Sequence, residues 1–476
     1  MPAPMKKKRP SGAAGPKAVA GRLAALRREF QARGLRQVKI GGFDIDGLFR
    51  GKYLSLDKFW GAAESGLGFC DVVFGWDLGD ELYDNAEVTG WHTGYPDTLA
   101  RIDLSTFRVI PWEPDTAAFI VDFEGAAGEP LAVSPRQLLQ RVEAAARAMN
   151  LRVKCGSEFE FFLFRETAAS LRQKGFRNLT TLSPGMFGYS WLRTSEAAAL
   201  VHALLDGLAD FGIPIEGFHT ETGPGVFEAA IGYDDLLPAA DKAALFKTAV
   251  KEIAARHGLV ACFMAKWNPD LPGCSGHLHQ SLWDLAGEKN HFAGTPASAR
   301  APHGLSPALA SYVAGQLTLM PELTALVWPT VNSYKRSVAN TWAPVTASWG
   351  LENRTCALRV IQPSPRATRV EFRQSGADMN PYVAMATSVA AGLHGLRERL
   401  ELPEPTVGNA YAGNAGGLAL PRDLGEAVER LRESRVARES LGDAFVEHYA
   451  RTREWEWRKY QRAVTDWELA RYLEAV

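Results

Sequence analysis

Apolar residues recur with helical spacing in several stretches of the chain. Ala18–Gly34 reads AVAGRLAALRREFQARG and ends at a glycine, which predicts a helix. Pro135 opens a second predicted helix, RQLLQRVEAAARAMN, because proline is tolerated in a first helical turn. Long alanine-rich segments at 236–257 and 378–399 predict further helices, and residues 430–464 have an amphipathic helical pattern.

Short runs typical of β-strands follow the first of these helices. They read QVKIGGFDIDG, RGKYLSL, FRVIPW and AAFIVDF. A long segment from GFCDVVFGWD to GWHTGYPDT has few strand features, and a loop of that length is usually functional. FEGAAGEPLAVSP has the glycine and proline content of a linker. We therefore predict a tail at 1–17, a helix with a small β-rich domain at 18–125, and a larger domain at 130–476.

The segment KCGSEFEFFLF, residues 154–164, combines a strand pattern with two unexpected charges. Successive side chains of a strand point to opposite faces, so Glu158 and Glu160 share one face. Phenylalanines and a leucine fill the rest of both faces. Neither face therefore offers the solvent that two like charges need, which makes this pair a candidate site.

The overall composition excludes several classes of function. With 476 residues, 46% of them hydrophobic, and a formal net charge of −1, the chain has no general attraction to nucleic acid or anionic membranes. No apolar run approaches the ~18 residues that a membrane span needs. The five cysteines are scattered without a C-x-x-C pair, which favours a reducing, cytoplasmic location over a disulfide framework or a zinc site.

The first residues, MPAPMKKKRPSGAAGPK, are basic but lack the apolar core of a secretory signal. Their KKKR run could contact nucleic acid or an acidic surface. A solvated tail of proline, glycine, alanine and lysine is the interpretation we adopt. We therefore expect neither a nucleic-acid partner nor a membrane.

In four other stretches, acids, imidazoles or arginines lie among apolar residues. FHTETGPGVFEAAIG holds Glu221 and Glu228 on either side of a Gly-Pro-Gly turn, and PGCSGHLHQSLW holds His277 and His279 at strand spacing. VNSYKRSVANTWAP and WGLENRTCALRVIQPSPRATRVEFR contribute Arg336, Arg354, Arg359, Glu371 and Arg373. Taken singly, each has an ordinary explanation: an edge-strand face, a hydrogen-bonded core histidine, or a surface ladder of charges.

The combination favours a different interpretation. Carboxylates that converge on one place repel one another, and divalent cations remove that repulsion. Carboxylate-rich sets with one imidazole suit Mg²⁺ or Mn²⁺, and nearby arginines offer paired donors to carboxylate and phosphate. Together these features indicate phosphoryl transfer. No P-loop, kinase signature or G-x-S-x-G motif is present.

These motifs resemble those of the glutamine synthetase family. SEFEFFLF, HTETGPGVFE, GHLHQSLW, NSYKR and NRTCALRV…RVEFR occur in the family's order, and the resemblance runs from Gln37 to the C-terminus. It implies an α+β fold: a small N-terminal β-grasp domain followed by a large catalytic domain with a curved antiparallel sheet and flanking helices. It also implies a homo-oligomeric ring, a dodecamer of two hexamers, with each site between two subunits.

The resemblance implies a role for each candidate residue. The matches to ligands of the metal nearer the substrate glutamate are Glu160, Glu221 and Glu228. The matches to ligands of the metal that bridges the ATP phosphates are Glu158, His277 and Glu371. Glutamate-binding positions match Gly273, Arg336 and Arg373. ATP-binding positions match Glu216, His279, Ser281, Arg354 and Arg359, and the two arginines match positions on the transferring phosphate and ATP.

The implied reaction has two steps. The γ-carboxylate of L-glutamate attacks the γ-phosphate of ATP, which gives γ-glutamyl phosphate and ADP. An amine then displaces phosphate and leaves a γ-glutamyl amide. Two or more Mg²⁺ or Mn²⁺ ions per site are the implied cofactors, and Arg354, Arg336 and Asp71 are the implied catalytic residues.

Three positions depart from the members that use ammonia. Where those members carry a glutamate that holds ammonium and takes its proton, this chain has Trp342. An indole has no carboxylate and no base, and its face suits an alkyl or aryl amine. FCDVVFGWD replaces the FDGSS loop, with Asp71 the nearest candidate for the second ammonium-side acid. Pro272 replaces an asparagine that contacts the substrate glutamate.

The leading hypothesis is therefore an ATP-dependent ligase of glutamate and a polyamine, alkylamine or arylamine. One alternative is a glutamine synthetase that takes its base from elsewhere, and another is a non-catalytic, ring-forming member of the family. All six ligand positions are filled, which argues against a scaffold, because a scaffold has little reason to keep mutually repelling acids. For Trp342 the alternative is a core tryptophan in a shifted alignment.

Overall fold

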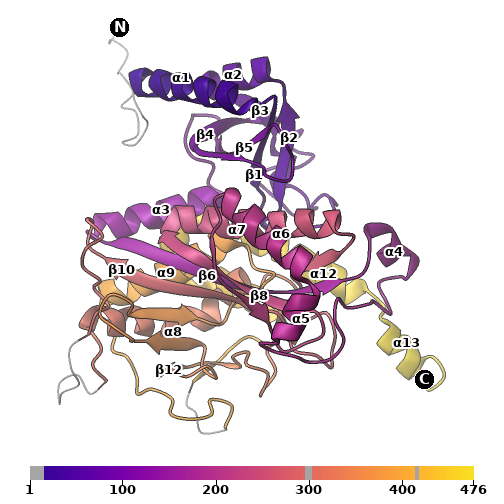
Figure 1. Ribbon diagram of the computed structural model, residues 1–476. Coiled ribbons are helices and arrows are strands. Elements are labelled where there is room, and N and C mark those ends of the chain that lie inside the picture. Colours follow the sequence, from indigo (N-terminus) through magenta and orange to yellow (C-terminus); the bar gives the residue numbers. More distant parts are fainter. Residues whose placement is uncertain (1–15, 295–302, 413–416) are drawn as a thin grey trace.

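The computed structural model describes residues 16–294, 303–412 and 417–476 (Figure 1). Most of the predicted tail, residues 1–15, lies outside the described residues. The rest of that tail begins helix α1 (Pro16–Arg33), so the first helix starts earlier than the predicted Ala18.

The first sheet has five strands in the order β2-β1-β5-β4-β3. Its strands are β1 (Gln37–Phe43), β2 (Phe49–Leu54), β3 (Leu67–Cys70), β4 (Asp97–Val109) and β5 (Thr116–Glu124). β1 and β5 are parallel, and the other neighbours are antiparallel. Helices α1 and α2 (Leu56–Ser65) lie beside this sheet (Figure 1). Phe59 joins them to it, with ring centroids 5.6 Å from Phe30 and 4.9 Å from Phe119.

Some elements of this region differ from the sequence-based expectation. Helix α2 and strand β3 were not predicted. Only the first three residues of the predicted strand FRVIPW, 107–109, form the end of the longer β4, and residues 110–112 lie beyond it. Between β3 and β4 the chain forms only a short 3-10 helix, η1 (Asp71–Phe74), and irregular structure, in agreement with the predicted long loop.

The larger sheet has eight strands, seven of them in the order β12-β13-β14-β10-β6-β8-β7, with β9 also paired to β6. Its strands are β6 (Arg152–Phe164), β7 (Ile215–Thr220), β8 (Val226–Asp235), β9 (Val260–Cys262), β10 (Gly276–Trp283), β12 (Trp349–Leu351), β13 (Leu358–Ile361) and β14 (Arg369–Phe372). The resemblance implied an antiparallel sheet. β12 and β13 are parallel to each other, so the sheet is mixed. β11 (Thr346–Ala347) and β15 (Leu418–Ala419) pair separately.

Helices surround this sheet on several sides (Figure 1). Those before β10 are α3 (Pro135–Ala148), α4 (Ala168–Gln173), α5 (Trp191–Glu196), α6 (Ala198–Asp210) and α7 (Leu236–Arg256). Those after β10 are α8 (Pro307–Val327), η2 (Ser333–Lys335), α9 (Pro381–Glu398), α10 (Leu424–Glu433), α11 (Arg435–Leu441), α12 (Asp443–Arg462) and α13 (Asp466–Tyr472). None of the helices in the described residues has the length and apolar composition needed to cross a bilayer.

Strand β6 separates the hydrophobic core from the face that carries charge. Phe159 is fully buried and its ring stacks on Phe246 of α7, with centroids 5.7 Å apart. Phe162 and Phe164, on the opposite face, pack against Trp267. Since side chains alternate along a strand, Glu158 and Glu160 point away from α7. The helix thus holds the strand that positions the two predicted acids.

The two sheets are joined by buried polar contacts. Arg453 of α12 donates to Asp46, which follows β1, at 2.6 Å, and both side chains are buried. The Asn380 amide, at the start of α9, donates to the carbonyl of Ile45 at 3.1 Å. The first sheet is therefore anchored to helices of the larger one by charged and polar bonds.

A buried histidine beside this joint predicts pH-dependent stability. Burial, and then the Arg453 cation, lower the pKa of His448 to about 4. The unfolded chain takes up this proton below pH ~6.5, whereas the folded chain takes it up only near pH 4, so stability is lost as the pH falls through that window. We expect His448→Leu to remove about 2 kcal/mol of the stability difference between pH 7.5 and pH 5. Urea unfolding at both pH values measures this, and an unchanged difference would contradict it.

Candidate active site

Strand register aligns charged side chains across one face of the larger sheet. From β13 to β7, neighbouring strands contribute in turn Arg359, Glu371, His277 and His279, Glu158 and Glu160, Glu228, and His219. Residues that face each other on paired strands have their side chains close together. The register therefore gathers groups that are far apart in the sequence.

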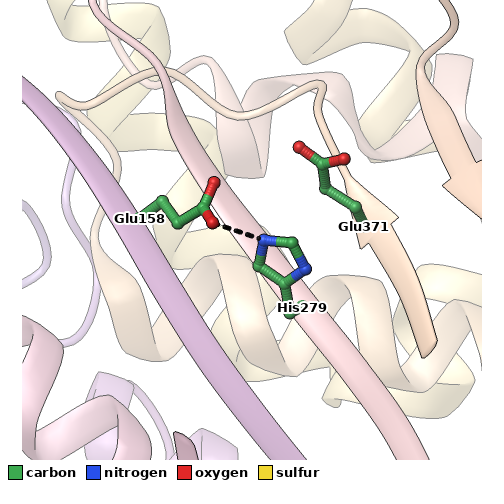
Figure 2. A group of neighbouring side chains, drawn as sticks. All are labelled: Glu158, His279 and Glu371. Carbon is green, nitrogen blue, oxygen red and sulfur yellow. Dashed lines mark ion pairs between the residues drawn. The ribbon is translucent and has the colours of Figure 1, made fainter. Parts of the chain in front are cut away.

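The first acidic group consists of Glu158, His277, His279 and Glu371. Figure 2 shows Glu158 and His279 on adjacent strands, with Glu371 on the next strand. His279 Nε2 lies 3.0 Å from a Glu158 oxygen, and His277 Nδ1 lies 3.4 Å from Glu371 and 3.7 Å from Glu158. The most compact set of possible metal ligands contains His279, which we had assigned to the nucleotide, in place of the predicted His277. Both imidazoles are within reach of the two carboxylates.

Both carboxylates of this group are held in the charged form. Burial opposes the charge of Glu371, yet Arg373, followed by His277 and His279, lowers its pKa to about 2. Burial also opposes the charge of Glu158, but the two imidazoles outweigh it and hold the pKa of Glu158 below its usual range. Two anionic carboxylates and two imidazole rings are therefore present as possible metal ligands at neutral pH.

The second acidic group consists of Glu160, Glu221, Glu228 and His219. His219 lies between two of the acids, 3.8 Å from Glu221 and 3.5 Å from Glu228, and its ring stacks on Tyr189. Burial, and then the Glu228 carboxylate that faces it, raise the pKa of Glu160 to about 7. Burial and the repulsion between the acids thus together raise the pKa of Glu160 enough for it to hold a proton near neutral pH in the absence of a cation.

A tight turn brings Glu221 and Glu228 together. The turn joins β7 to β8, and Gly225 within it has a φ of +74°. A Cβ there would lie 2.8 Å from the backbone nitrogen of Leu182, so only glycine fits. The Gly-Pro-Gly motif therefore positions the two acids, as its sequence predicts.

Two cavities meet at the first acidic group. One cavity, of about 460 Å³, is lined by Glu216, His279 and Ser281, and we call it the nucleotide cavity because these residues are predicted to bind ATP. The central cavity, of about 630 Å³, is lined by all six predicted metal ligands. Glu158 lines both cavities, so the two spaces adjoin at this carboxylate.

Four arginines line the central cavity, as does Gly273. Arg336 is buried and donates to the Ser275 hydroxyl at 2.9 Å, and Arg373 forms an ion pair with Glu371. A Cβ at Gly273 would overlap the carbonyl oxygen of Ala265 and lie 2.9 Å from Cγ of Arg336, so this glycine allows the close approach of both. The other two are Arg354 and Arg359, and Arg359 lies 3.1 Å from Glu371.

Trp342 also lines the central cavity and is not a core residue. Its side chain is 59% exposed, which excludes the core-tryptophan alternative. Its φ of +61° is unusual for a bulky residue and is found mostly where the surrounding contacts enforce it. The Tyr411 hydroxyl donates to the next carbonyl, that of Ala343, at 3.1 Å. The loop that carries the indole is therefore held at its base.

Asp71 is the one predicted site residue that the structure leaves outside these cavities. It lies in η1 beside the first sheet, and its carboxylate accepts a hydrogen bond from the Thr89 hydroxyl at 2.6 Å. It is not among the described residues that line the central cavity. Within one chain, the expected second acid therefore does not reach Trp342.

Sequence reasoning missed His219 and Tyr189. His219 stands two positions before Glu221 and could have been found from its spacing, because alternate strand residues share a face. Tyr189 lies in the irregular segment after α4, where no periodic signal exists. Both line the central cavity.

The arrangement combines anionic oxygen donors, imidazoles and fixed guanidinium groups in adjoining cavities. Acids can hold divalent cations, and guanidinium groups can bind carboxylates and phosphates through paired hydrogen bonds. Such a site can align two anions and neutralise the charge that develops between them. Activation of a carboxylate by phosphoryl transfer needs these properties.

Comparison with known proteins agrees with this chemistry. Residues 132–472 match the family model described as glutamine synthetase, catalytic domain. The chain is 50% identical over 442 residues to type-1 glutamine synthetase 2 of Dictyostelium discoideum, with 92% of this chain and 84% of the relative covered. It is 40% identical over 444 residues to glutamate–isopropylamine ligase of a Pseudomonas species, with 92% and 95% covered.

A solved structure of GmaS in complex with ADP has the same fold. The two superpose with a TM-score of 0.81 at 29% sequence identity, and the match covers 95% of this chain and 99% of the other. The similarity thus includes the first sheet as well as the region of the family model. The family model matches more than half of this chain, and relatives of 50% and 40% identity match 92% of it. The chain therefore belongs to the glutamine synthetase family.

Proposed function

We propose that the protein joins an organic amine to the γ-carboxylate of L-glutamate in an ATP-dependent reaction that passes through γ-glutamyl phosphate. The observation that carries this proposal is that Trp342 lines the same cavity as both acidic groups. The groups that can activate a carboxylate and an apolar surface for the acceptor amine therefore line one cavity. One relative is a ligase of glutamate and isopropylamine, which supports the proposal.

Two divalent cations, Mg²⁺ or Mn²⁺, fit the two acidic groups. In each group three possible ligand atoms lie within 4.8 Å of one another, and oxygen-rich sets with one imidazole suit these ions. Those atoms belong to Glu158, His279 and Glu371 in one group and to His219, Glu221 and Glu228 in the other. Following the family resemblance, we assign one cation to Glu158, His277 and Glu371, and the other to Glu160, Glu221 and Glu228. His277 also lies 3.7 and 3.4 Å from Glu158 and Glu371, which supports its assignment. When bound, the cations supply positive charge that neutralises the phosphate oxygens.

The side chains of the chain bind and align the substrates in this proposal. Arg336 and Arg373 bind the carboxylates of glutamate, since buried guanidinium groups pair strongly with such anions. Arg354 and Arg359 neutralise the transferring phosphate. ATP occupies the nucleotide cavity, where His279 lies beside Glu158.

A glutamine synthetase that uses ammonia is the second candidate, because the relative with 50% identity carries that name. Sequence identity over the whole chain reflects the shared fold and the shared chemistry of carboxylate activation. Which amine is accepted depends on only a few residues. At the acceptor end this chain has an indole, which cannot take a proton from ammonium. We therefore favour the organic amine, with Asp71 of a neighbouring subunit as the proposed base.

Trp342→Glu is expected to raise kcat/KM for ammonium about tenfold or more, because a positioned general base contributes about 10²–10⁴-fold. The use of organic amines should fall in the same variant. Phosphate release with ATP, glutamate and Mn²⁺, measured against ammonium and a series of amines, tests both statements. Trp342→Gln is the matched control, since it has the same size as the glutamate without its charge.

Two outcomes of this assay would overturn the proposal. Wild-type protein that uses ammonium as well as any organic amine would be a glutamine synthetase. Wild-type protein that binds ATP but releases no phosphate with any amine would be a non-catalytic member of the family.

We also propose the finer features that the family resemblance implies. The five-stranded sheet with α1 and α2 corresponds to a β-grasp domain within 18–125, followed by a catalytic domain at 130–476. A homo-oligomeric ring, a dodecamer of two hexamers, would bring Asp71 of one copy towards the site of the next. The five free cysteines support a cytoplasmic location.

A further inference from the structure

A third space, the side cavity, adjoins the central cavity. It has a volume of about 560 Å³ and lies between the loop of Trp342, the end of β12 and residues 405–408. Trp342 and Arg354 line both cavities, so the indole forms part of a shared wall. The two cavities therefore adjoin at the indole and at Arg354.

The free surface of the side cavity is largely apolar. Its walls include Trp342, Leu351, Pro405 and Val407, and the Val407 side chain is 90% exposed. Two polar side chains of the wall, Asn353 and Thr355, form hydrogen bonds within the wall itself. The Asn353 amide donates to the carbonyls of Thr406 and Gly408, at 3.1 and 2.8 Å. These bonds hold the wall in place, and carbon atoms of its side chains remain exposed to a ligand.

The charges around the side cavity do not favour a second cation. Among the described residues that line it, Glu352 is the only acid, and its carboxylate forms a 2.5 Å ion pair with Arg359. Arg354 adds a positive charge to the same wall. Glu404 lies just outside this lining, where its side chain is 87% exposed and its carboxylate lies 3.3 Å from the lining His303. A second ammonium group of a ligand would therefore meet a repelling guanidinium and no unpaired carboxylate in the wall, so it would lose hydration with little compensation.

We infer that the side cavity holds the carbon substituent of the acceptor, and that the acceptor is a monoamine with an alkyl or aryl group of several carbons. This inference rests on the proposed ligase function and narrows it, because it excludes polyamines and diamines as preferred acceptors. The reacting nitrogen stays in the central cavity and the substituent passes the indole. The volume falls within the range of roughly 300–1,000 Å³ that is typical of small-molecule sites.

A series of amines tests the inference on the wild-type protein. Phosphate release with ATP, glutamate and Mn²⁺ is measured with methylamine, propylamine, butylamine, hexylamine and benzylamine, and with 1,3-diaminopropane, which matches butylamine in length. We expect kcat/KM to rise about threefold per added methylene up to hexylamine, since each buried methylene contributes favourably. Butylamine should exceed 1,3-diaminopropane about tenfold or more.

The outcomes separate this inference from the proposed function. Activity with methylamine that does not rise with chain length, or equal use of butylamine and 1,3-diaminopropane, would overturn the inference and leave the ligase function intact. Activity with ammonium alone would overturn both.

A pair of variants tests the location of the substituent. Val407→Asp places an acid in the side cavity at an exposed position, and Val407→Asn has the same shape without the charge. The ratio of kcat/KM for 1,3-diaminopropane to that for butylamine should be about threefold higher in the Asp variant than in the Asn variant, as expected of a partly exposed ion pair. Equal ratios in the two variants, with both proteins folded and active, would place the substituent elsewhere.

Discussion

Glu228→Gln is expected to lower kcat about 10³-fold while the metal-free protein becomes as stable as the wild type or more stable. Glu228 faces Glu160 across paired strands and lies 3.5 Å from His219. Removing one anion from the group weakens the site for a divalent cation and for the charge that develops in phosphoryl transfer, where a single lost contact is worth about 10²–10³-fold. The same change removes a like-charge repulsion, which is why stability should not fall.

Thermal unfolding with and without Mn²⁺ measures the stability half of this prediction. A ligand that binds only the folded state raises the melting temperature, so Mn²⁺ should stabilise the wild type and have much less effect on Glu228→Gln. Glu439→Gln, at an exposed ion pair on α11, is the control and should behave as the wild type. Normal activity of the variant would show that the Glu228 carboxylate is not needed at the metal site. Strong destabilisation of the metal-free protein would show that Glu228 has a structural role.

Arg136→Met is expected to destabilise the protein by about 3–5 kcal/mol, the largest loss of stability we predict for a single residue. Arg136 lies in α3 and is 3% exposed. Its guanidinium donates at 2.9 Å to Asp103 of β4, Asp122 of β5 and Asp241 of α7. Methionine replaces the volume but leaves three carboxylates without their shared cation, so the network that joins the first sheet to α3 and α7 would repel itself.

Urea unfolding at one protein concentration measures this loss, because assembly also contributes to stability. Arg147→Met, on the same helix, removes only an exposed pair with Glu143 and should change stability by less than about 0.5 kcal/mol. Equal effects of the two substitutions would mean that the buried network contributes no more than a surface pair.

The elements of the larger sheet differ in how well the sequence predicts them. β6 could be predicted with its two faces, because it is long and its apolar residues cover both sides. β12 and β13 have three and four residues and are parallel to each other, so their pairing depends on packing and leaves no periodic signal. The same limit applies to α2 and β3 in the first sheet.

The site shows a similar division. Motifs in the chain identify the acids and arginines as candidates, but the partner of each acid depends on strand register. Glu371 meets His279 and Arg359 only because β14 lies between β10 and β13. His219 could have been found from its spacing to Glu221, but its pairing with Glu228 depends on the facing strand. Family resemblance assigned the predicted acids and arginines to their roles, and spacing alone could not have done so.

The acids and the indole occupy different kinds of structure. The acids lie on or beside strands of one sheet, whereas Trp342 lies on the connection between η2 and β11. An exchange of that connection would alter which nucleophile is admitted without disturbing the sheet. The fold is therefore well suited to diversification: duplicated genes could acquire new acceptors by changing one loop, and protein engineers could follow the same route.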